Sequence, residues 1–216
     1  MKASASTLRK PGRRLRIGAG IVIVLAVVVL GLAMVRAKQA SAPTTVPDHP
    51  ITTANGRGIS PPWPVPVDVA DSVHDADLPM LPSAGTAQRF DVHLDIVVDG
   101  QRVAVAPLVG VDQRSGQVSP VSTHDSSGIV YIASPVRSTF SLGQFFTEWQ
   151  VALDATHIGG LATGDGNNLV AYVNGRKVGG DPAAITFAAH EEIVLVYGGH
   201  DSPAPVPATF SWPQGL

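Results

Sequence analysis

The chain of 216 residues contains no cysteine. This absence excludes disulfide bonds, cysteine nucleophiles, thiolate metal sites and lipid attachment through cysteine. Aromatic residues make up only 6% of the chain, so we expect a mostly aliphatic core. Glycine (22 residues) and proline (18 residues) are plentiful, which predicts many loops and turns.

Acidic residues are missing from residues 1–38, which hold eight of the 15 basic residues. The rest of the chain holds the other seven basic residues and all 17 acidic ones, a net charge of −10. A domain that binds nucleic acid needs a basic surface. The acidic downstream part therefore argues against nucleic acid as a partner.

Residues 17–35, IGAGIVIVLAVVVLGLAMV, form an apolar run without a charge. At about 1.5 Å per helical residue this run spans roughly 28 Å, close to the thickness of a bilayer core. Basic residues gather before it, so the positive-inside rule predicts a cytoplasmic tail (1–16), a transmembrane helix (17–35) and an extracytoplasmic remainder at the cell membrane. The alternative is a signal peptide cleaved near VRA (35–37), although the run is longer than the usual apolar region of such peptides.

Half of the prolines lie between residues 39 and 88. Because proline lacks an amide proton and fixes φ, most of this stretch is not expected to form helix or central strand. We predict a flexible linker over 36–59. Residues 60–88 also carry Trp63 and several aliphatic side chains, which favours docking of this segment on the downstream domain. The alternative is a proline-rich ligand for a partner protein.

The segment 89–198 has the pattern of one β-rich domain. Alternating apolar residues over 90–98 followed by Asp99-Gly100 predict a hairpin in which Val98 faces Gln101 and Ile96 faces Val103. Asn174-Gly175 predicts a second hairpin, and strands are expected at 129–133 and 191–198. SLGQFFTEWQV, beginning at Ser141, predicts the one helix, with a capping box and a buried apolar stripe.

This order of elements predicts an α+β fold, with a single helix packed on a mixed sheet. Two hairpins flanking a helix, followed by a last strand, are similar to the β-grasp arrangement. Residues 199–216 are rich in proline, and we expect a poorly ordered tail there.

Five segments resemble an uncharacterised extracytoplasmic domain family of membrane-anchored proteins, chiefly of actinobacteria. They are PPWPVPVDV, HLDIVVDGQRV, SPVSTHDSSGIVYIASP, FSLGQFFTEW and AYVNGRKV, which fall within residues 60–198. The resemblance implies a location and a fold but no activity. Family members carry clustered histidines that imply a metal site. Here Arg89, Asp91, Ser122 and Tyr131 stand where further histidines would be, so the resemblance implies a depleted site.

The residues themselves suggest a divalent metal site built from His93, His124 and Asp125, with Asp91 or Asp95 as a further ligand. Imidazole and carboxylate groups suit Zn²⁺, Cu²⁺ or Ni²⁺. Asp91 and His93 lie two apart on one strand, so both point to the same face. The alternative is structural, with Asp125 shaping a turn and His124 as its neighbour.

An enzyme is the third possibility, because His124, Asp125, Ser126 and Ser127 include the residue types of a catalytic triad. Neighbours in sequence rarely meet as a triad, however, and there is no Gly-x-Ser-x-Gly motif. The interpretation that needs the fewest features is a non-catalytic binding or interaction module of the cell envelope, because it requires only a β-rich domain, an anchor and a spacer. It would be held by the membrane helix 17–35 and take an unknown ligand or envelope protein, with metal binding as the alternative.

Overall fold

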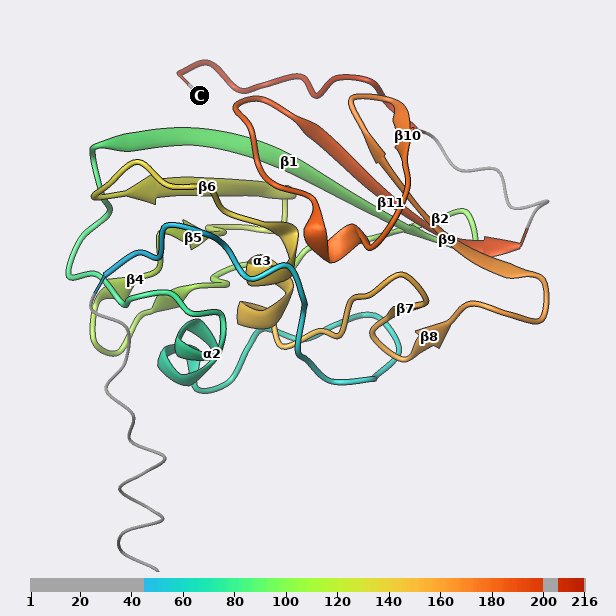
Figure 1. Ribbon diagram of the computed structural model, residues 1–216, viewed down its shortest axis with the longest axis horizontal. Helices are drawn as coiled ribbons and strands as arrows, with labels where there is room; N and C mark the ends of the chain where they lie inside the picture. Colours follow the sequence, from blue (N-terminus) through green and yellow to red (C-terminus); the bar gives the residue numbers. More distant parts are fainter. Residues whose placement is uncertain (1–44, 200–205, 216) are drawn as a thin grey trace, which may run out of the picture. The chain divides into compact units, whose positions relative to one another are not determined.

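The computed structural model describes residues 45–199 and 206–215 (Figure 1). The described part is rich in β-strands and has two α-helices, so the α+β prediction is confirmed. Its helices and strands are, in chain order, α2 (Val69–Asp75), β1 (Gln88–Val98), β2 (Gln101–Val103), β3 (Val111–Asp112), β4 (Gln117–Val118), β5 (Val121–Ser122), β6 (Ile129–Ser134), α3 (Leu142–Glu148), β7 (His157–Ile158), β8 (Leu161–Ala162), β9 (Asn167–Val173), β10 (Arg176–Val178), the 3₁₀ turn η1 (Pro182–Ala184) and β11 (Glu192–Gly199).

One curled, mixed sheet of seven strands organises the domain: six follow the order β10-β9-β11-β1-β6-β5, and the seventh, β2, pairs with β1. The central pair, β1 and β11, is parallel, and the other pairs are antiparallel. Strand β1 is long enough to pair on one edge with two partners, β6 along its first half and β2 at its end. The parallel pair brings together residues about 100 positions apart in the sequence.

Both predicted hairpins are confirmed. In the first, Ile96 pairs with Val103 and Val98 with Gln101. Asp99 and Gly100 have φ values of 49° and 77°, and Asn174 and Gly175 have φ values of 50° and 74°. A two-residue turn with positive φ at both positions matches the twist of the flanking strands, which explains why Asp-Gly and Asn-Gly occupy these turns.

Helix α3 begins with the predicted capping box. The Gln144 backbone N–H donates to Ser141 Oγ at 3.1 Å, and Gln144 Oε1 accepts from the Ser141 backbone N–H at 3.2 Å. The apolar stripe of this helix is fully buried and packs on the sheet residues Val92, Leu94 and Ile96 in one core. The core thus lies on one face of the sheet, which we call the inner face.

The prediction of a single helix is wrong, because Val69–Asp75 forms α2 within the proline-rich segment. Prolines lie before it, up to Pro66, and after it, from Pro79, so residues 67–78 are free of proline and long enough for two turns. The segment around α2 packs on α3, where Trp63 is only 4% exposed and makes an edge contact with Trp149 at 5.7 Å between ring centroids.

The flexible linker predicted over 36–59 is also corrected for its described part, residues 45–59. Ser138 Oγ donates to the Pro47 carbonyl at 2.5 Å, and the Asn55 backbone N–H donates to Thr147 Oγ1 at 3.1 Å. Isolated bridges join Ala54 to Leu153 and Arg57 to Val151. Residues 45–59 therefore lie against the domain, because their backbone groups find partners on and around α3.

The predicted transmembrane helix, residues 17–35, lies outside the described residues. Among the helices of 45–199 and 206–215, none has the length and apolar character needed to cross a membrane.

The sequence predicts a poorly ordered tail over residues 199–216, but its described part, residues 206–215, packs on the sheet. Figure 1 shows this segment crossing the sheet on the side opposite to the two helices. The Phe210 ring stacks on His93, and Trp212 lies 5.0 Å from the His190 ring, centroid to centroid. We call this side of the sheet the outer face, and residues 206–215 the C-terminal strap.

Candidate functional site

Polar side chains gather on the outer face near the middle of β1. Because side chains alternate along a strand, Asp91, His93 and Asp95 point away from the core. The parallel pairing of β1 and β11 places Glu192 directly beside His93. His93 is 4% exposed, Asp95 8% and Glu192 0%, so a histidine and two acidic residues are enclosed together.

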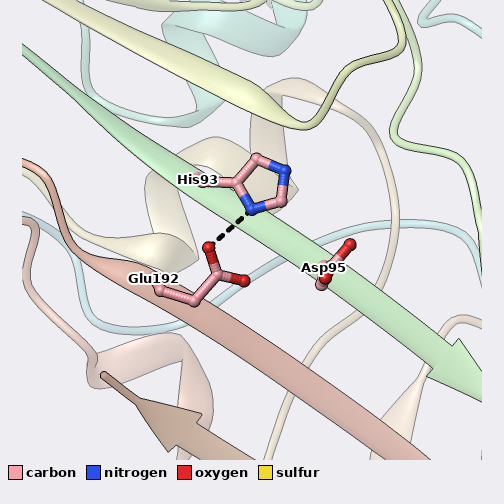
Figure 2. A group of neighbouring side chains, drawn as sticks. All are labelled: His93, Asp95 and Glu192. Atoms are coloured by element: carbon pink, nitrogen blue, oxygen red, sulfur yellow. Dashed lines mark hydrogen bonds and ion pairs between the residues drawn. The ribbon is translucent and has the colours of Figure 1, made fainter. Parts of the chain in front are cut away.

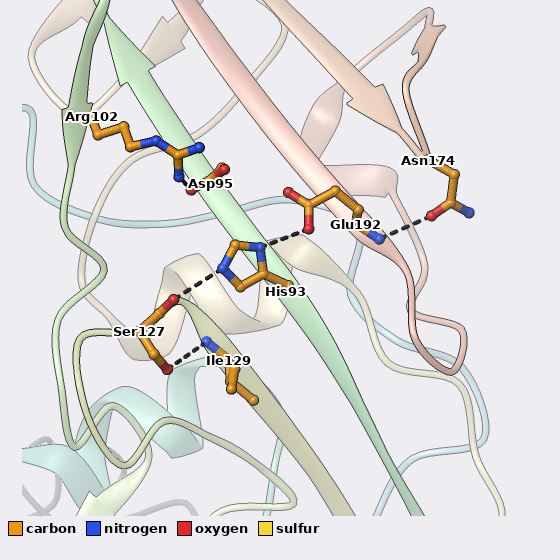
Figure 3. A network of polar contacts seen from close by, with 7 residues as sticks. All are labelled: His93, Asp95, Arg102, Ser127, Ile129, Asn174 and Glu192. Atoms are coloured by element: carbon orange, nitrogen blue, oxygen red, sulfur yellow. Dashed lines mark hydrogen bonds and ion pairs between the residues drawn. The ribbon is translucent and has the colours of Figure 1, made fainter. Parts of the chain in front are cut away.

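His93 is held by both of its ring nitrogens (Figure 3). Nδ1 lies 2.7 Å from Glu192 Oε2, and Nε2 lies 3.0 Å from the Ser127 carbonyl oxygen. A carbonyl only accepts hydrogen bonds, so Nε2 carries a proton and donates it. The ring orientation is thereby fixed, with Nδ1 directed at the Glu192 carboxylate.

The loop before β6 presents the Ser127 carbonyl to His93. Asp125 Oδ1 accepts from the Ser127 backbone N–H at 2.9 Å, and Ser127 Oγ accepts from the Ile129 backbone N–H at 3.3 Å. Gly128 follows with φ of 88°, and a Cβ there would come within 2.5 Å of the Leu94 carbonyl oxygen. Glycine is thus required for the close approach of this loop to β1.

Glu192 makes only part of its possible hydrogen bonds. Oε2 contacts His93, whereas Oε1 is buried without a hydrogen-bond partner among the described residues. The Glu192 backbone N–H donates to Asn174 Oδ1 at 2.9 Å, which ties β11 to the turn of the second hairpin. Asp95 lies on the other side of the cluster and pairs through Oδ1 with Arg102 of β2.

Donor atoms of His93, Asp95 and Glu192 all lie within 4.8 Å of one another (Figure 2). One imidazole nitrogen and two carboxylate oxygens are ligand types that divalent transition metals accept. We call these three residues the His93 cluster. Among the residues that the structure describes, it is the group arranged closely enough to hold a metal ion.

The structure separates the residues that the sequence suggested as one metal site. His93 belongs to the cluster, and Asp95, a suggested further ligand, joins it. His124 and Asp125 are exposed and are not members. His124 stacks instead on Tyr131, with ring centroids 4.2 Å apart and planes at 19°. Hydrogen bonds from Ser127 hold the pKa of Asp125 below its usual value, as expected for a turn-forming carboxylate.

Glu192 is the cluster member that the sequence did not single out. It lies 99 positions from His93, at the start of the last strand. Only the register between β1 and β11 brings the two together. The one available signal is an acidic residue opening a strand that is otherwise apolar, in EEIVLVYG.

A pocket of about 620 Å³ opens on the outer face beside the cluster. Its polar walls include Arg89, Asp91, His124, Tyr131 and His190, and Gly215 of the C-terminal strap lies at its edge. Burial raises the pKa of the Asp91 carboxyl, and the positive charges of His190, Arg89 and His124 partly oppose that rise. Carboxylate, guanidinium, imidazole and phenol groups thus line one hollow. We call it the outer pocket.

The C-terminal strap covers the cluster. The Phe210 ring lies 3.7 Å from the His93 ring between centroids, with the planes at 9°. Trp212 packs edge-on against Phe210 at 5.1 Å. The strap thus shields the His93 cluster, while the outer pocket opens beside it.

A third buried acid, Glu148, lies on the inner side, away from this face. Glu148, the last residue of α3, is completely buried and accepts a hydrogen bond from Ser119 Oγ at 2.5 Å. Its Oε2 has no hydrogen-bond partner among the described residues. Burial raises the pKa of Glu148 well above its usual value, and the Ser119 hydrogen bond lowers it by less. Burial in the core therefore favours the protonated form of this carboxyl.

No family model, curated protein or solved structure matches this chain. The function must therefore be argued from the residues and their geometry.

Proposed function

We propose that the chain is a single-pass, membrane-anchored binding module that presents its β-rich domain outside the cytoplasm and acts without catalysis. The observation that carries the binding role is the outer pocket, which is roomy, combines charged and aromatic groups with apolar walls, and is built on strands β1, β5 and β6. The apolar run 17–35 and its basic flank support the anchor. The binding partner would be a ligand or protein of the cell envelope.

We further propose a β-grasp-like frame for the module. The strands β2-β1-β11-β9-β10 and helix α3 support this interpretation, with a parallel central pair between two hairpins. Strands β5 and β6 extend the frame along the free half of β1. This extension supplies Ser122 and Tyr131 to the outer pocket, so the addition to the frame coincides with the binding surface.

The orientation of the chain in the membrane can be tested with single introduced cysteines, because the chain has none of its own. Ser6→Cys places a thiol before the apolar run, and Ala155→Cys places one at an exposed position of the domain. A membrane-impermeant maleimide added to intact spheroplasts is expected to label Ala155→Cys and not Ser6→Cys. After the membrane is dissolved, both should be labelled. Labelling of Ser6→Cys alone in intact spheroplasts would overturn the proposed orientation.

The chemistry of the outer pocket suits a saccharide. Asp91 and Arg89 carry opposite charges, which favours an uncharged ligand over an ion. Carboxylate, guanidinium and phenol groups can bond to sugar hydroxyls. The rings of Tyr131 and His124 form a stacked pair on which the apolar face of a sugar ring can pack.

Binding can be tested with the purified full-length chain, in detergent and labelled with a fluorophore, on an array of neutral oligosaccharides. We expect selective binding that Tyr131→Ala reduces at least tenfold. Tyr172→Ala is the matched control, because Tyr172 lines a different hollow of the sheet. Equal loss in both variants, or no binding by the wild-type chain, would refute the saccharide proposal.

Metal binding is the second candidate function. The observation that favours it is the His93 cluster. The ligand set suggested by the sequence, His93, His124 and Asp125, has less support than this cluster, because His124 and Asp125 point to solvent or to Tyr131.

A further inference from the structure

We propose that His93, Asp95 and Glu192 form a binding site for one divalent transition-metal ion of the zinc type. The site deepens the second candidate function, metal binding, on which it rests, and it uses different residues from the proposed saccharide site. His93 and Asp95 come from β1, and Glu192 comes from β11. The two strands are parallel and central, so the three ligands stand on strands that are hydrogen-bonded to neighbours on both sides.

The orientation of His93 is the first argument. A histidine that binds a metal through one ring nitrogen commonly donates its other N–H to a carbonyl, which fixes the ring and its tautomer. Here Nε2 donates to the Ser127 carbonyl at 3.0 Å, and Nδ1 lies 2.7 Å from Glu192 Oε2. Asp125 and Gly128 contribute by shaping the loop that holds this carbonyl in place.

The incomplete bonding of Glu192 is the second and independent argument. Its side chain is completely buried, yet Oε1 has no hydrogen-bond partner among the described residues. Buried polar atoms are nearly always bonded, and one that is not calls for a physical explanation. Figure 2 shows this oxygen on the side of Asp95. A cation between the two carboxylates would satisfy it.

The charge balance of the cluster is the third argument. Two carboxylates and one histidine lie together under the strap, and Arg102 is the cation paired with them. Arg102 contacts Asp95 Oδ1, which leaves Oδ2 with its lone pairs free to bind. The Nδ1–Oε2 contact of His93 and Glu192 contains one proton. A metal ion at Nδ1 displaces that proton to solvent.

The donor set indicates the class of metal. Zn²⁺ accepts histidine nitrogen and carboxylate oxygen at about 2.0 to 2.2 Å, often from three protein ligands. Calcium and magnesium prefer sites built from oxygen alone, so the imidazole disfavours them. Ligand atoms around a tetrahedral ion lie about 3.4 Å apart, so donors now within 4.8 Å would close by roughly 1 to 1.5 Å. Rotation of the two carboxylate side chains can supply this movement.

The test uses the full-length chain in detergent, purified without a polyhistidine tag and stripped with a chelator. Zinc is added, the excess is removed, and bound zinc is measured by mass spectrometry and calorimetric titration. We expect one zinc ion per chain. At a hundredfold excess over Kd, the melting temperature should rise by roughly 5 to 10 °C. Absence of stoichiometric zinc would overturn the proposal.

Isosteric variants locate the site. Glu192→Gln and Asp95→Asn should each weaken zinc binding at least tenfold. Two controls should bind like the wild type: Glu191→Gln, which removes the half-buried neighbouring acid, and His124→Ala, which removes the other candidate ligand. Retention of wild-type affinity in Glu192→Gln, or its loss in His124→Ala, would contradict the assignment.

Cobalt absorption, measured together with circular dichroism, distinguishes loss of the metal ligand from loss of folding. Co²⁺ in place of zinc gives visible absorption bands that depend on the ligands around it. We expect these bands in the wild-type chain and their loss in Glu192→Gln, while the far-ultraviolet circular dichroism of the apo variant stays as in the wild type. If Glu192→Gln does not fold, Asp95→Asn takes its place. Unchanged bands in a folded variant would refute the site.

Discussion

Single residues on this sheet act through backbone geometry as much as through their own chemistry. Asp125 is exposed and does not reach His93, yet it holds the loop whose carbonyl orients the His93 ring. Gly128 permits that loop to approach β1, because any side chain there would strike the Leu94 carbonyl. The His-Asp pair at 124–125 thus consists of a pocket residue and a turn residue. The residues of this loop that touch β1 directly are Ser127, through its carbonyl, and Gly128.

Glu148 gives a prediction of pH dependence at the residue scale. Because burial raises the pKa of its carboxyl in the folded state, the stability it contributes is fully present below the unfolded pKa, near 4.5. It is lost as the pH rises toward the raised folded value. The free energy of unfolding of Glu148→Gln, minus that of the wild type, should therefore rise above pH 4.5 by about 1.4 kcal/mol per pH unit. Urea unfolding of both chains at several pH values measures it, and a difference that stays flat would be inconsistent with a protonated Glu148.

Elements with local signals are the ones that the sequence predicts well. Asp99-Gly100 and Asn174-Gly175 each specify a turn through the φ values of two adjacent residues. Ser141 and Gln144 specify the start of α3 within four residues. Helix α2 lacks such a signal, because the high proline content of residues 39–88 argues against a helix, whereas the prolines on either side of residues 67–78 leave a stretch long enough for a short one.

The N-cap of α3 yields a prediction at the scale of elements. Ser141 Oγ accepts from the Gln144 backbone N–H and also donates to the Ile51 carbonyl. Ser141→Ala should therefore lower the free energy of unfolding by about 1 to 2 kcal/mol, because a cap and a buried partner are both lost. Ser126→Ala, at an exposed position, is the control and should change it by less than about 0.5 kcal/mol. Equal effects in urea unfolding would mean that the cap contributes nothing.

At the scale of the whole molecule, the outer face depends on contacts between distant segments. The cluster needs the β1–β11 register, and its cover needs the C-terminal strap. Neither leaves a local pattern, because parallel pairing and strap packing are set by the tertiary fold. His93 and Asp95 could be chosen from strand alternation alone, whereas Glu192 could not. The sequence of residues 206–215 predicts only a proline-rich tail, because the partners of its aromatic residues, His93 and His190, lie far away in the sequence.

The strap gives the prediction at this scale. Phe210 is half-buried and stacks on His93. Phe210→Ala should lower the free energy of unfolding by about 1 to 2 kcal/mol through lost apolar contact and ring stacking. It should also speed the modification of His93 by diethyl pyrocarbonate, measured by peptide mass spectrometry. Thr209→Ala, at an exposed neighbour, is the control. Wild-type stability and an unchanged rate at His93 would show that the strap does not cover the cluster.

We propose that the outer face carries the function and that its buried centre is the His93 cluster. Zinc-edge anomalous diffraction from crystals of the zinc-loaded chain tests it most directly. We expect one strong peak about 2.0 to 2.2 Å from His93 Nδ1 and from one carboxylate oxygen each of Asp95 and Glu192. A peak beside His124 and Asp125, or no peak on the outer face, would contradict it.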